Sequence, residues 1–187
     1  MARFRTLLPT LLGVLMLSIS SASASASESD RTSLAQGPRA YAIGDSVLLG
    51  AKQELRDLGI RVDAVEGRQP QRLRGAISDL PKDGRPIVIH LGTNGLFDQE
   101  TCRDLIRGVD GRRDVVLVTV HAPRSWVSGS NKTIRSCARK MKDSSVGLIN
   151  WHRIARTFPN LVYGDGIHLR PAGVETLVDQ IQQHLDL

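Results

Sequence analysis

The chain has 187 residues and a formal net charge of +6, with 41% hydrophobic and 4% aromatic residues. This is enough chain for one domain with a single buried core. The basic residues are scattered and few aromatic side chains are present to stack on bases, so the composition argues against nucleic-acid binding.

Residues 1–26 have the pattern of a secretory signal peptide. Arg3 and Arg5 form a basic start, residues 7–19 are mostly apolar, and residues 21–26 alternate Ser and Ala and so offer Ala-x-Ala cleavage sites. A membrane anchor is the alternative, but the apolar run is short for the roughly 20 residues of a spanning helix. We therefore expect cleavage, export of the protein, and a formal charge of +4 once these two arginines are lost.

After this segment, residues 27–38 are predicted to be a linker and residues 39–187 a single domain. Short apolar segments predict five strands, at residues 39–44, 60–65, 86–91, 115–120 and 146–150. Apolar residues at helical spacing predict five helices, at residues 48–58, 73–80, 99–109, 132–141 and 171–185. This alternation predicts an α/β fold with an open parallel sheet and helices on both faces. Ligand sites in such folds lie at the carboxyl ends of the strands.

The two cysteines, Cys102 and Cys137, are expected to form a disulfide, because a pair of cysteines in an exported protein is usually joined. A cysteine nucleophile or a metal site is the alternative, but neither cysteine has a second Cys or His nearby at ligand spacing. Both fall in predicted helices, so the geometry of those helices decides whether the bond can form.

Gly44-Asp45-Ser46 lies where the first strand ends and the first helix begins. A corner of this kind can expose one hydroxyl in a crevice, which makes Ser46 a candidate nucleophile. A serine nucleophile needs a base, a partner that orients the base, and donors for the oxyanion. By itself the tripeptide is equally compatible with an ordinary turn and helix N-cap.

Later segments contain candidates for each of these parts. Asp165 and His168 are three residues apart in a predicted turn, so His168 could present one ring nitrogen to Ser46 and the other to Asp165. Asn94 follows a buried strand, and its amide could bind the oxyanion together with the backbone N–H groups of Gly67 and Ser46. Taken singly, the Asp165 to His168 segment could be a surface turn, and the breaks at Gly67 and Asn94 could simply end strands.

The order of these motifs along residues 40–185 resembles the SGNH (GDSL-like) hydrolase superfamily. The segments Gly-Asp-Ser-Val-Leu-Leu-Gly, Val-Asp-Ala-x-x-Gly-Arg-Gln, His-Leu-Gly-Thr-Asn-Gly and Asp-Gly-Ile-His-Leu are similar to those of SGNH domains fused to bacterial membrane acyltransferases. The resemblance implies a flavodoxin-like three-layer α/β/α sandwich with five parallel strands, and chemistry through an acyl-serine without a metal or cofactor. Ser46, Asp165 and His168 would be the triad, and Ser46, Gly67 and Asn94 the oxyanion hole.

The sequence departs from this family at two points. Gly95 stands where many members have Asp, which affects the expected substrate contacts; we assign substrate binding to Asp45, Gly95 and His121. The membrane acyltransferase domain is not in the sequence, so an acyl-donor partner would be a separate chain.

We expect a secreted serine esterase that acts, as a monomer, on O-acyl groups of cell-envelope or extracellular carbohydrate. An O-acetyltransferase that works with a membrane acyl-donor protein is one alternative, and a noncatalytic carbohydrate-binding module is another.

Overall fold

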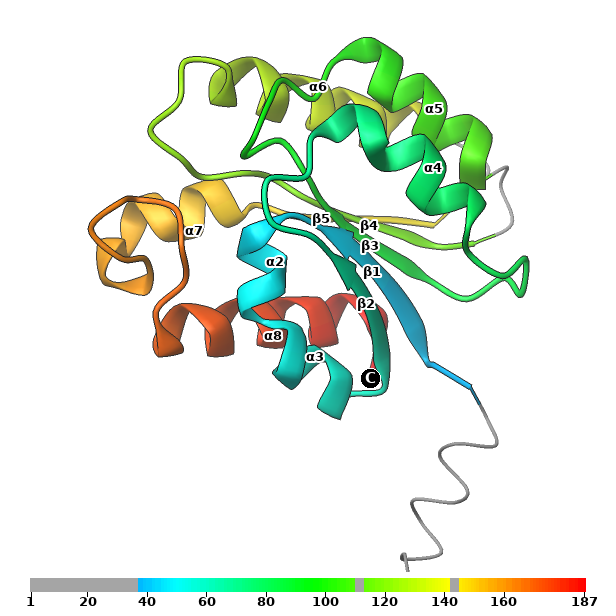
Figure 1. Cartoon of the computed structure of the whole chain (residues 1–187), viewed down its shortest axis with the longest axis horizontal. Helices are drawn as coiled ribbons and strands as arrows, with labels where there is room; N and C mark the ends of the chain where they lie inside the picture. Colours follow the sequence, from blue (N-terminus) through cyan, green and yellow to red (C-terminus); the bar gives the residue numbers. More distant parts are fainter. Residues whose placement is uncertain (1–36, 110–112, 142–144) are drawn as a thin grey trace, which may run out of the picture. The chain divides into compact units, whose positions relative to one another are not determined.

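Five parallel strands form the central sheet (Figure 1). The structure is a computed structural model that describes residues 37–109, 113–141 and 145–187. The strands are β1 (Ala40–Gly44), β2 (Ile60–Ala64), β3 (Ile87–His90), β4 (Val115–Val118) and β5 (Val146–Ile149). Their order in the sheet is β2-β1-β3-β4-β5. The chain moves outward to β2 on one side of β1 and to β3, β4 and β5 on the other, so the strand order reverses between β1 and β3.

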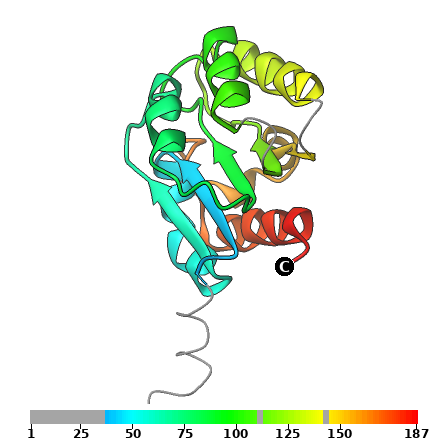
Figure 2. The same cartoon turned by 90° about the vertical axis from the view of Figure 1, so that its right-hand side faces the viewer.

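Helices cover both faces of this sheet. They are α2 (Ser46–Gly50), α3 (Lys52–Asp57), α4 (Leu73–Ser78), α5 (Gln99–Val109), α6 (Val127–Lys140), α7 (Trp151–Thr157) and α8 (Pro171–Leu185). Two 3₁₀ turns, η1 (Pro70–Arg72) and η2 (Pro159–Leu161), precede α4 and follow α7. Helices α2, α3 and α8 lie on one side of the sheet, and α4, α5 and α6 lie on the other (Figures 1 and 2).

Two apolar cores result from the alternation of side chains along each strand. Ala42 of β1 and Val116 of β4 pack with α2, α3, α7 and α8, whereas Ile43 and Leu117 pack with α4, α5 and α6. Because both faces are covered, every residue of β1, β3 and β4 is buried. The predicted three-layer α/β/α fold is confirmed.

The predicted disulfide is present in the second of these cores. Cys102 of α5 and Cys137 of α6 are both buried and bonded, with a Cα–Cα distance of 5.7 Å. The two helices lie side by side on the same face of the sheet (Figures 1 and 2), which brings the cysteines within bonding distance.

Three helix predictions need correction. The predicted helix at residues 48–58 is two helices, because the backbone at Ala51 leaves the helical region (φ −104°, ψ 12°). Helix α6 begins at Val127, five residues earlier than expected, because the Ser, Gly and Asn residues that weaken the helical pattern there make tertiary contacts. Helix α7 was not predicted; Asn150 caps its start by accepting a hydrogen bond from the Arg153 backbone N–H.

The described residues, from residue 37 onward, form one compact unit. The predicted signal peptide and nearly all of the predicted linker lie outside the described residues. None of the helices that the structure describes is long and apolar enough to cross a membrane.

Candidate active site

Ser46 is the first residue of α2 and follows the carboxyl end of β1. A Cβ atom at Gly44 would lie 2.4 Å from the Leu48 Cβ, so only glycine allows the first turn of α2 to fold so closely over the end of the strand. The Asp45 carboxylate caps the helix by accepting a 3.1 Å hydrogen bond from the Val47 backbone N–H. This corner leaves the Ser46 side chain partly exposed at the edge of the sheet where the strand order reverses.

Asp45 itself is not positioned to contact a substrate, which corrects the expectation from the sequence. The residue is fully buried, and its Oδ1 lies 3.6 Å from Nδ1 of the equally buried His90 at the end of β3. Burial raises the pKa of Asp45, but the adjacent His90 imidazole and the hydrogen bond from the Val47 N–H outweigh this and hold the pKa below its ordinary value. Asp45 therefore stabilises the turn between β1 and α2 that carries Ser46, from a buried position.

A short antiparallel hairpin carries Asp165 and His168, the other two residues of the candidate triad. Its two arms pair at Val162 and Leu169, and the Tyr163 N–H donates 2.8 Å to the His168 carbonyl oxygen. Arg170 secures the base of this hairpin by donating from its backbone N–H to Leu161 and from its side-chain Nε to Val162. The hairpin leads directly into α8, which packs on the sheet and so fixes the position of His168.

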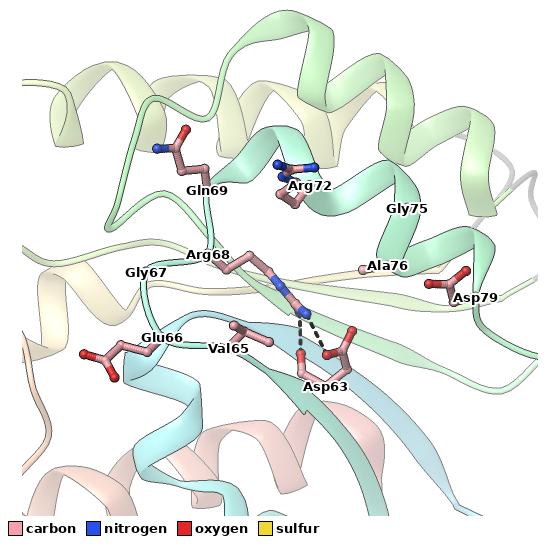
Figure 3. A pocket seen from close by; sticks show the side chains of 10 residues that line it. All are labelled: Asp63, Val65, Glu66, Gly67, Arg68, Gln69, Arg72, Gly75, Ala76 and Asp79. Carbon is pink, nitrogen blue, oxygen red and sulfur yellow. Dashed lines mark hydrogen bonds and ion pairs between the residues drawn. The ribbon is translucent and has the colours of Figure 1, made fainter.

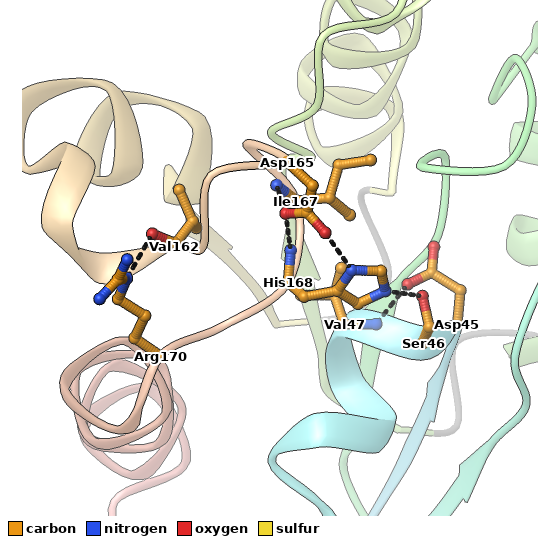
Figure 4. Close-up of polar contacts among 8 residues, drawn as sticks. All are labelled: Asp45, Ser46, Val47, Val162, Asp165, Ile167, His168 and Arg170. Atoms are coloured by element: carbon orange, nitrogen blue, oxygen red, sulfur yellow. Dashed lines mark hydrogen bonds and ion pairs between the residues drawn. The ribbon is translucent and has the colours of Figure 1, made fainter.

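Ser46, His168 and Asp165 form a continuous chain of polar contacts (Figure 4). His168 Nε2 lies 3.2 Å from Ser46 Oγ, and His168 Nδ1 lies 2.6 Å from Asp165 Oδ2. The other carboxylate oxygen of Asp165 accepts from the backbone N–H groups of Ile167 and His168. The hydrogen bond with His168, aided by these backbone donors, lowers the pKa of Asp165 to about 2. A carboxylate that stays ionised can hold the imidazole in the tautomer whose Nε2 accepts a proton from Ser46.

The two further residues expected at the oxyanion hole lie on the loops that follow β2 and β3, the two strands that flank β1. Gly67 is exposed with φ +69°, a left-handed conformation that favours glycine. Asn94 is half-buried, and its Nδ2 is a buried donor without a hydrogen-bond partner among the described residues. A buried donor without a partner, on a loop that follows a neighbour of β1, is compatible with a role in an oxyanion hole.

The loops that hold Gly67 and Asn94 touch each other. A Cβ atom on Gly95 would meet Pro70 Cδ at 3.5 Å, and the Gln71 side chain donates to the Leu96 carbonyl oxygen. Arg68 fixes the first loop by donating to the Asp63 carbonyl oxygen and to its carboxylate, both at 2.6 Å. Gly95 is half-buried at this junction, and it stays a candidate for substrate contact.

His121 lies on the loop after β4, on the side of the site that faces the triad hairpin. Pro123 of the same loop is a neighbour of Gly166 in that hairpin. His121 Nδ1 lies 3.4 Å from Nδ1 of His152, the second residue of α7. Partial burial lowers the pKa of both imidazoles, and for His121 the neighbouring imidazole lowers it further. The sequence did not predict this pair, because nothing in the spacing of the two residues indicates that they meet.

The sequence also missed the residues that hold the loops in place. The first part of α6 does most of this: Trp126, which precedes the helix, donates from its indole N–H to the Gly92 carbonyl oxygen, and Ser130 accepts from the Phe97 N–H. Asn131 donates to the Val120 carbonyl oxygen and accepts from the Val120 N–H, at 2.9 and 2.8 Å. The loops that follow β3 and β4 are therefore both hydrogen-bonded to the start of α6.

Across residues 37–109, 113–141 and 145–187, no three His, Cys, Asp or Glu side chains gather as the ligands of a metal ion would.

Comparison with known proteins finds similar O-acetyltransferases. Over 150 residues, or 77% of the chain, it is 31% identical to the O-acetyltransferase OatA of Staphylococcus aureus. Over 148 residues, or 75%, it is 31% identical to the peptidoglycan O-acetyltransferase OatA of Listeria monocytogenes. The chain spans only 24% and 23% of the lengths of these two relatives. No protein-family model matches the chain.

Solved structures share its fold. The C-terminal catalytic domain of peptidoglycan O-acetyltransferase A from Streptococcus pneumoniae, solved as a methylsulfonyl adduct, superposes with a TM-score of 0.68 at 20% identity, covering 80% of this chain and 93% of that one. A GDSL-like lipase from Bacteroides thetaiotaomicron superposes with a TM-score of 0.60 at 16% identity, covering 84% and 95%.

Proposed function

The chain belongs to the SGNH (GDSL-like) hydrolase superfamily, and on this basis we propose that it moves acetyl groups on cell-wall peptidoglycan through an acyl-serine at Ser46. The observation that supports this most directly is the chain of contacts from Ser46 through His168 to Asp165. The relatives are named as O-acetyltransferases, one of them as a peptidoglycan O-acetyltransferase, and this supports peptidoglycan as the substrate class.

The proposed reaction begins with attack of Ser46 Oγ on the ester carbonyl carbon. His168 Nε2, 3.2 Å away, takes the hydroxyl proton and then returns it to the leaving alcohol oxygen. Asp165 holds Nδ1 of the imidazole and stabilises its positive charge. Water or a sugar hydroxyl then attacks the acyl-serine carbonyl and gives its proton to His168. The bond to Ser46 Oγ breaks, His168 returns the proton to Oγ, and acetate or a new acetyl ester leaves.

Donors for the oxyanion are the backbone N–H groups of Ser46 and Gly67 and the Nδ2 of Asn94. The unpartnered, buried Nδ2 of Asn94 supports this assignment, because a donor that bonds to nothing in the resting protein can bond to charge that develops in the transition state. Gly67 supports it because a glycine backbone allows close approach by a substrate.

Hydrolysis and transfer share this acyl-serine and differ only in what attacks it. We propose hydrolysis of O-acetyl esters as the activity of the chain by itself, since water needs no binding site of its own. Transfer to a glycan hydroxyl is the second candidate, and the observation that favours it is the O-acetyltransferase names of the relatives. For transfer, a membrane acyl-donor protein would supply the acetyl group.

We further propose that the protein is exported and acts as a monomer. The signal-peptide pattern of residues 1–26 supports export, and so does the disulfide between Cys102 and Cys137, because such bonds persist in oxidising compartments outside the cytosol. Immunoblotting of culture fractions together with the mass of the exported protein would test this: the expected mass is that of a chain cut after Ala24 or Ala26.

The test of the catalytic proposal is hydrolysis of 4-nitrophenyl acetate by the protein and by Ser46→Ala and His168→Ala. We expect each substitution to lower kcat by about 10⁶-fold, since triad residues act as a unit. Ser128→Ala is the matched control, because Ser128 is an exposed serine on α6. A fluorophosphonate should add one label to the wild type and none to Ser46→Ala, as read by intact mass. Absence of both turnover and label would instead favour a noncatalytic carbohydrate-binding module.

The direction of the reaction is tested with peptidoglycan fragments. Incubation with O-acetylated fragments should release acetate, and incubation with an acyl donor and unacetylated fragments shows transfer as a mass increase of one acetyl group. Ser46→Ala serves as the blank in both assays, and the faster of the two reactions identifies the activity.

A further inference from the structure

A hollow of about 600 Å³ lies between the end of β2 and helix α4 (Figure 3). Its volume is within the range of about 300–1,000 Å³ that is typical of small-ligand sites. The residues that line it come from β2, from the loop that follows, and from η1 and α4. Gly67, one of the proposed oxyanion donors, forms part of this lining, so the hollow borders the candidate active site.

The position of the hollow relative to Ser46 follows from strand pairing. Ala64, the last residue of β2, pairs with Gly44, and the Val65 N–H donates to the Gly44 carbonyl oxygen. Gly44 precedes Ser46 by two residues, so the near end of the hollow starts beside the nucleophile corner. The far end reaches Asp79, at the end of α4.

The floor of the hollow is fixed. The Arg68 side chain lies across it and donates to Asp63 in two places, so both charges of this pair are satisfied (Figure 3). Val65 contributes an apolar surface that is 49% exposed, unusual for a large apolar residue in this protein. A fixed floor with one apolar surface suits a rigid ring with an apolar face.

The walls offer unused polar groups. Glu66 and Asp79 bring acceptors, whereas Gln69 and Arg72 bring donors, and all four side chains are exposed. In the part of the chain that the structure describes, none of these side chains makes a hydrogen bond or ion pair. Since Arg68 and Asp63 neutralise each other, the remaining charge is one positive against two negative. This balance disfavours a polyanion and suits an uncharged ligand with many hydroxyl and amide groups.

We propose that this hollow is a glycan subsite, which binds an uncharged N-acetylated sugar unit next to the one whose ester reacts at Ser46. The proposal rests on the proposed function, because that function makes the substrate a polymer whose chain must continue beyond the reacting sugar. A sugar whose ester carbonyl meets Ser46 and the Gly67 N–H can extend its chain past Gly67 into the hollow. Arg72 and Asp79 would bond to its hydroxyl and amide groups, and Val65 would contact its ring.

The subsite can be tested without any catalysis. The full chain carrying Ser46→Ala is labelled with ¹⁵N and titrated with chitohexaose, an uncharged oligomer of N-acetylglucosamine, while amide shifts are followed by NMR. We expect shifts to concentrate at residues 65–79 and the dissociation constant to rise about tenfold when Arg72→Ala or Asp79→Ala is added, the loss expected for hydrogen bonds to a charged group. Arg74→Ala is the matched control, because Arg74 is exposed on α4 but does not line the hollow.

A kinetic comparison gives a second readout. With Ser46 intact, kcat/KM is measured for an O-acetylated N-acetylglucosamine oligomer and for 4-nitrophenyl acetate. Arg72→Ala should lower the ratio of the first value to the second about tenfold, because KM for the oligomer rises. Circular dichroism confirms that the variants are folded.

The two proposals fail in different ways. Lack of ester turnover by the wild type would overturn the proposed function, yet shifts at residues 65–79 would still support the subsite. Shifts confined to other surfaces, no binding at millimolar sugar, or equal losses in Arg72→Ala and Arg74→Ala would each overturn the subsite.

Discussion

The contacts of Asp165 indicate its role in the candidate site. Its carboxylate receives His168 Nδ1 at 2.6 Å and two backbone N–H groups, and these lower its pKa to about 2. The carboxylate therefore stays ionised through the pH range in which such an enzyme is assayed. Its role in the proposed mechanism is to orient and stabilise the imidazole, without exchanging a proton.

This predicts the pH dependence of the reaction. On acidification, the profile of kcat/KM for 4-nitrophenyl acetate should contain no ionisation from Asp165, because this carboxyl does not take up a proton until the pH approaches 2. Asp165→Asn should lower kcat by about 10⁴-fold, since an amide favours the wrong tautomer. An acid ionisation that is present in the wild-type profile and absent from that of Asp165→Asn would contradict this assignment.

Asp45 is the other residue whose environment decides its role. It is fully buried beside His90, caps α2, and has a pKa below its ordinary value. A carboxyl whose pKa is lower in the folded state stabilises the protein at pH values above its unfolded pKa. That stabilisation is lost as the pH falls through the folded pKa.

We therefore predict that Asp45→Asn lowers the free energy of unfolding by about 2 kcal/mol near pH 7, because the hydrogen bonds to a charged acceptor are lost. The difference between wild type and variant should shrink as the pH falls below about 4, the ordinary pKa of an aspartate. Urea unfolding at several pH values measures this. A difference that is constant with pH would show that the charge of Asp45 does not stabilise the fold.

Among the helices and strands, α6 is the element that holds the loops of the candidate site in place. Its first turns contain Ser130 and Asn131, which bond to the loops after β3 and β4. These residues have weak helix propensity, which is why the sequence pattern placed the start of the helix too late. The same side chains that weaken the local helical signal make the contacts that position Asn94 and His121.

Asn131→Leu should therefore destabilise the protein by about 3 kcal/mol, because both the N–H and the carbonyl oxygen of buried Val120 lose their partner. Lys132→Ala, the exposed neighbour, should change stability by less than about 0.5 kcal/mol. Thermal and urea unfolding of the two variants give the comparison. Equal effects would mean that the two bonds from Asn131 contribute nothing to stability.

For the whole molecule, the disulfide links two helices on the face of the sheet that α4, α5 and α6 cover. The bond closes a segment with a sequence separation of 35 residues, and it should stabilise the protein chiefly by restricting the unfolded chain. Both cysteines are buried in the apolar core on this face, whereas the candidate triad lies at the carboxyl ends of the strands.

We predict that Cys102→Ala with Cys137→Ala lowers the free energy of unfolding by about 3–4 kcal/mol, the loop-closure effect expected for this length. While folded at 25 °C, the double variant should hydrolyse 4-nitrophenyl acetate as the wild type does. Denaturant unfolding with and without reductant checks the first part: reductant should destabilise only the wild type. Loss of activity in the folded variant would show that the bond also shapes the site.

The sequence by itself predicted the five strands, their parallel sheet, a disulfide between Cys102 and Cys137, and the candidates Ser46, Asp165 and His168, although it missed α7 and the division of the first helix. It could do so because hydrophobic periodicity and turn residues are local signals, and because Asp165 and His168 meet through a local turn. Only the tertiary structure decided that Asp45 is buried behind the nucleophile, that His121 meets His152, and that a hollow opens beside Gly67. These depend on which strands are neighbours and on how loops distant in the chain pack together, and no local pattern encodes that.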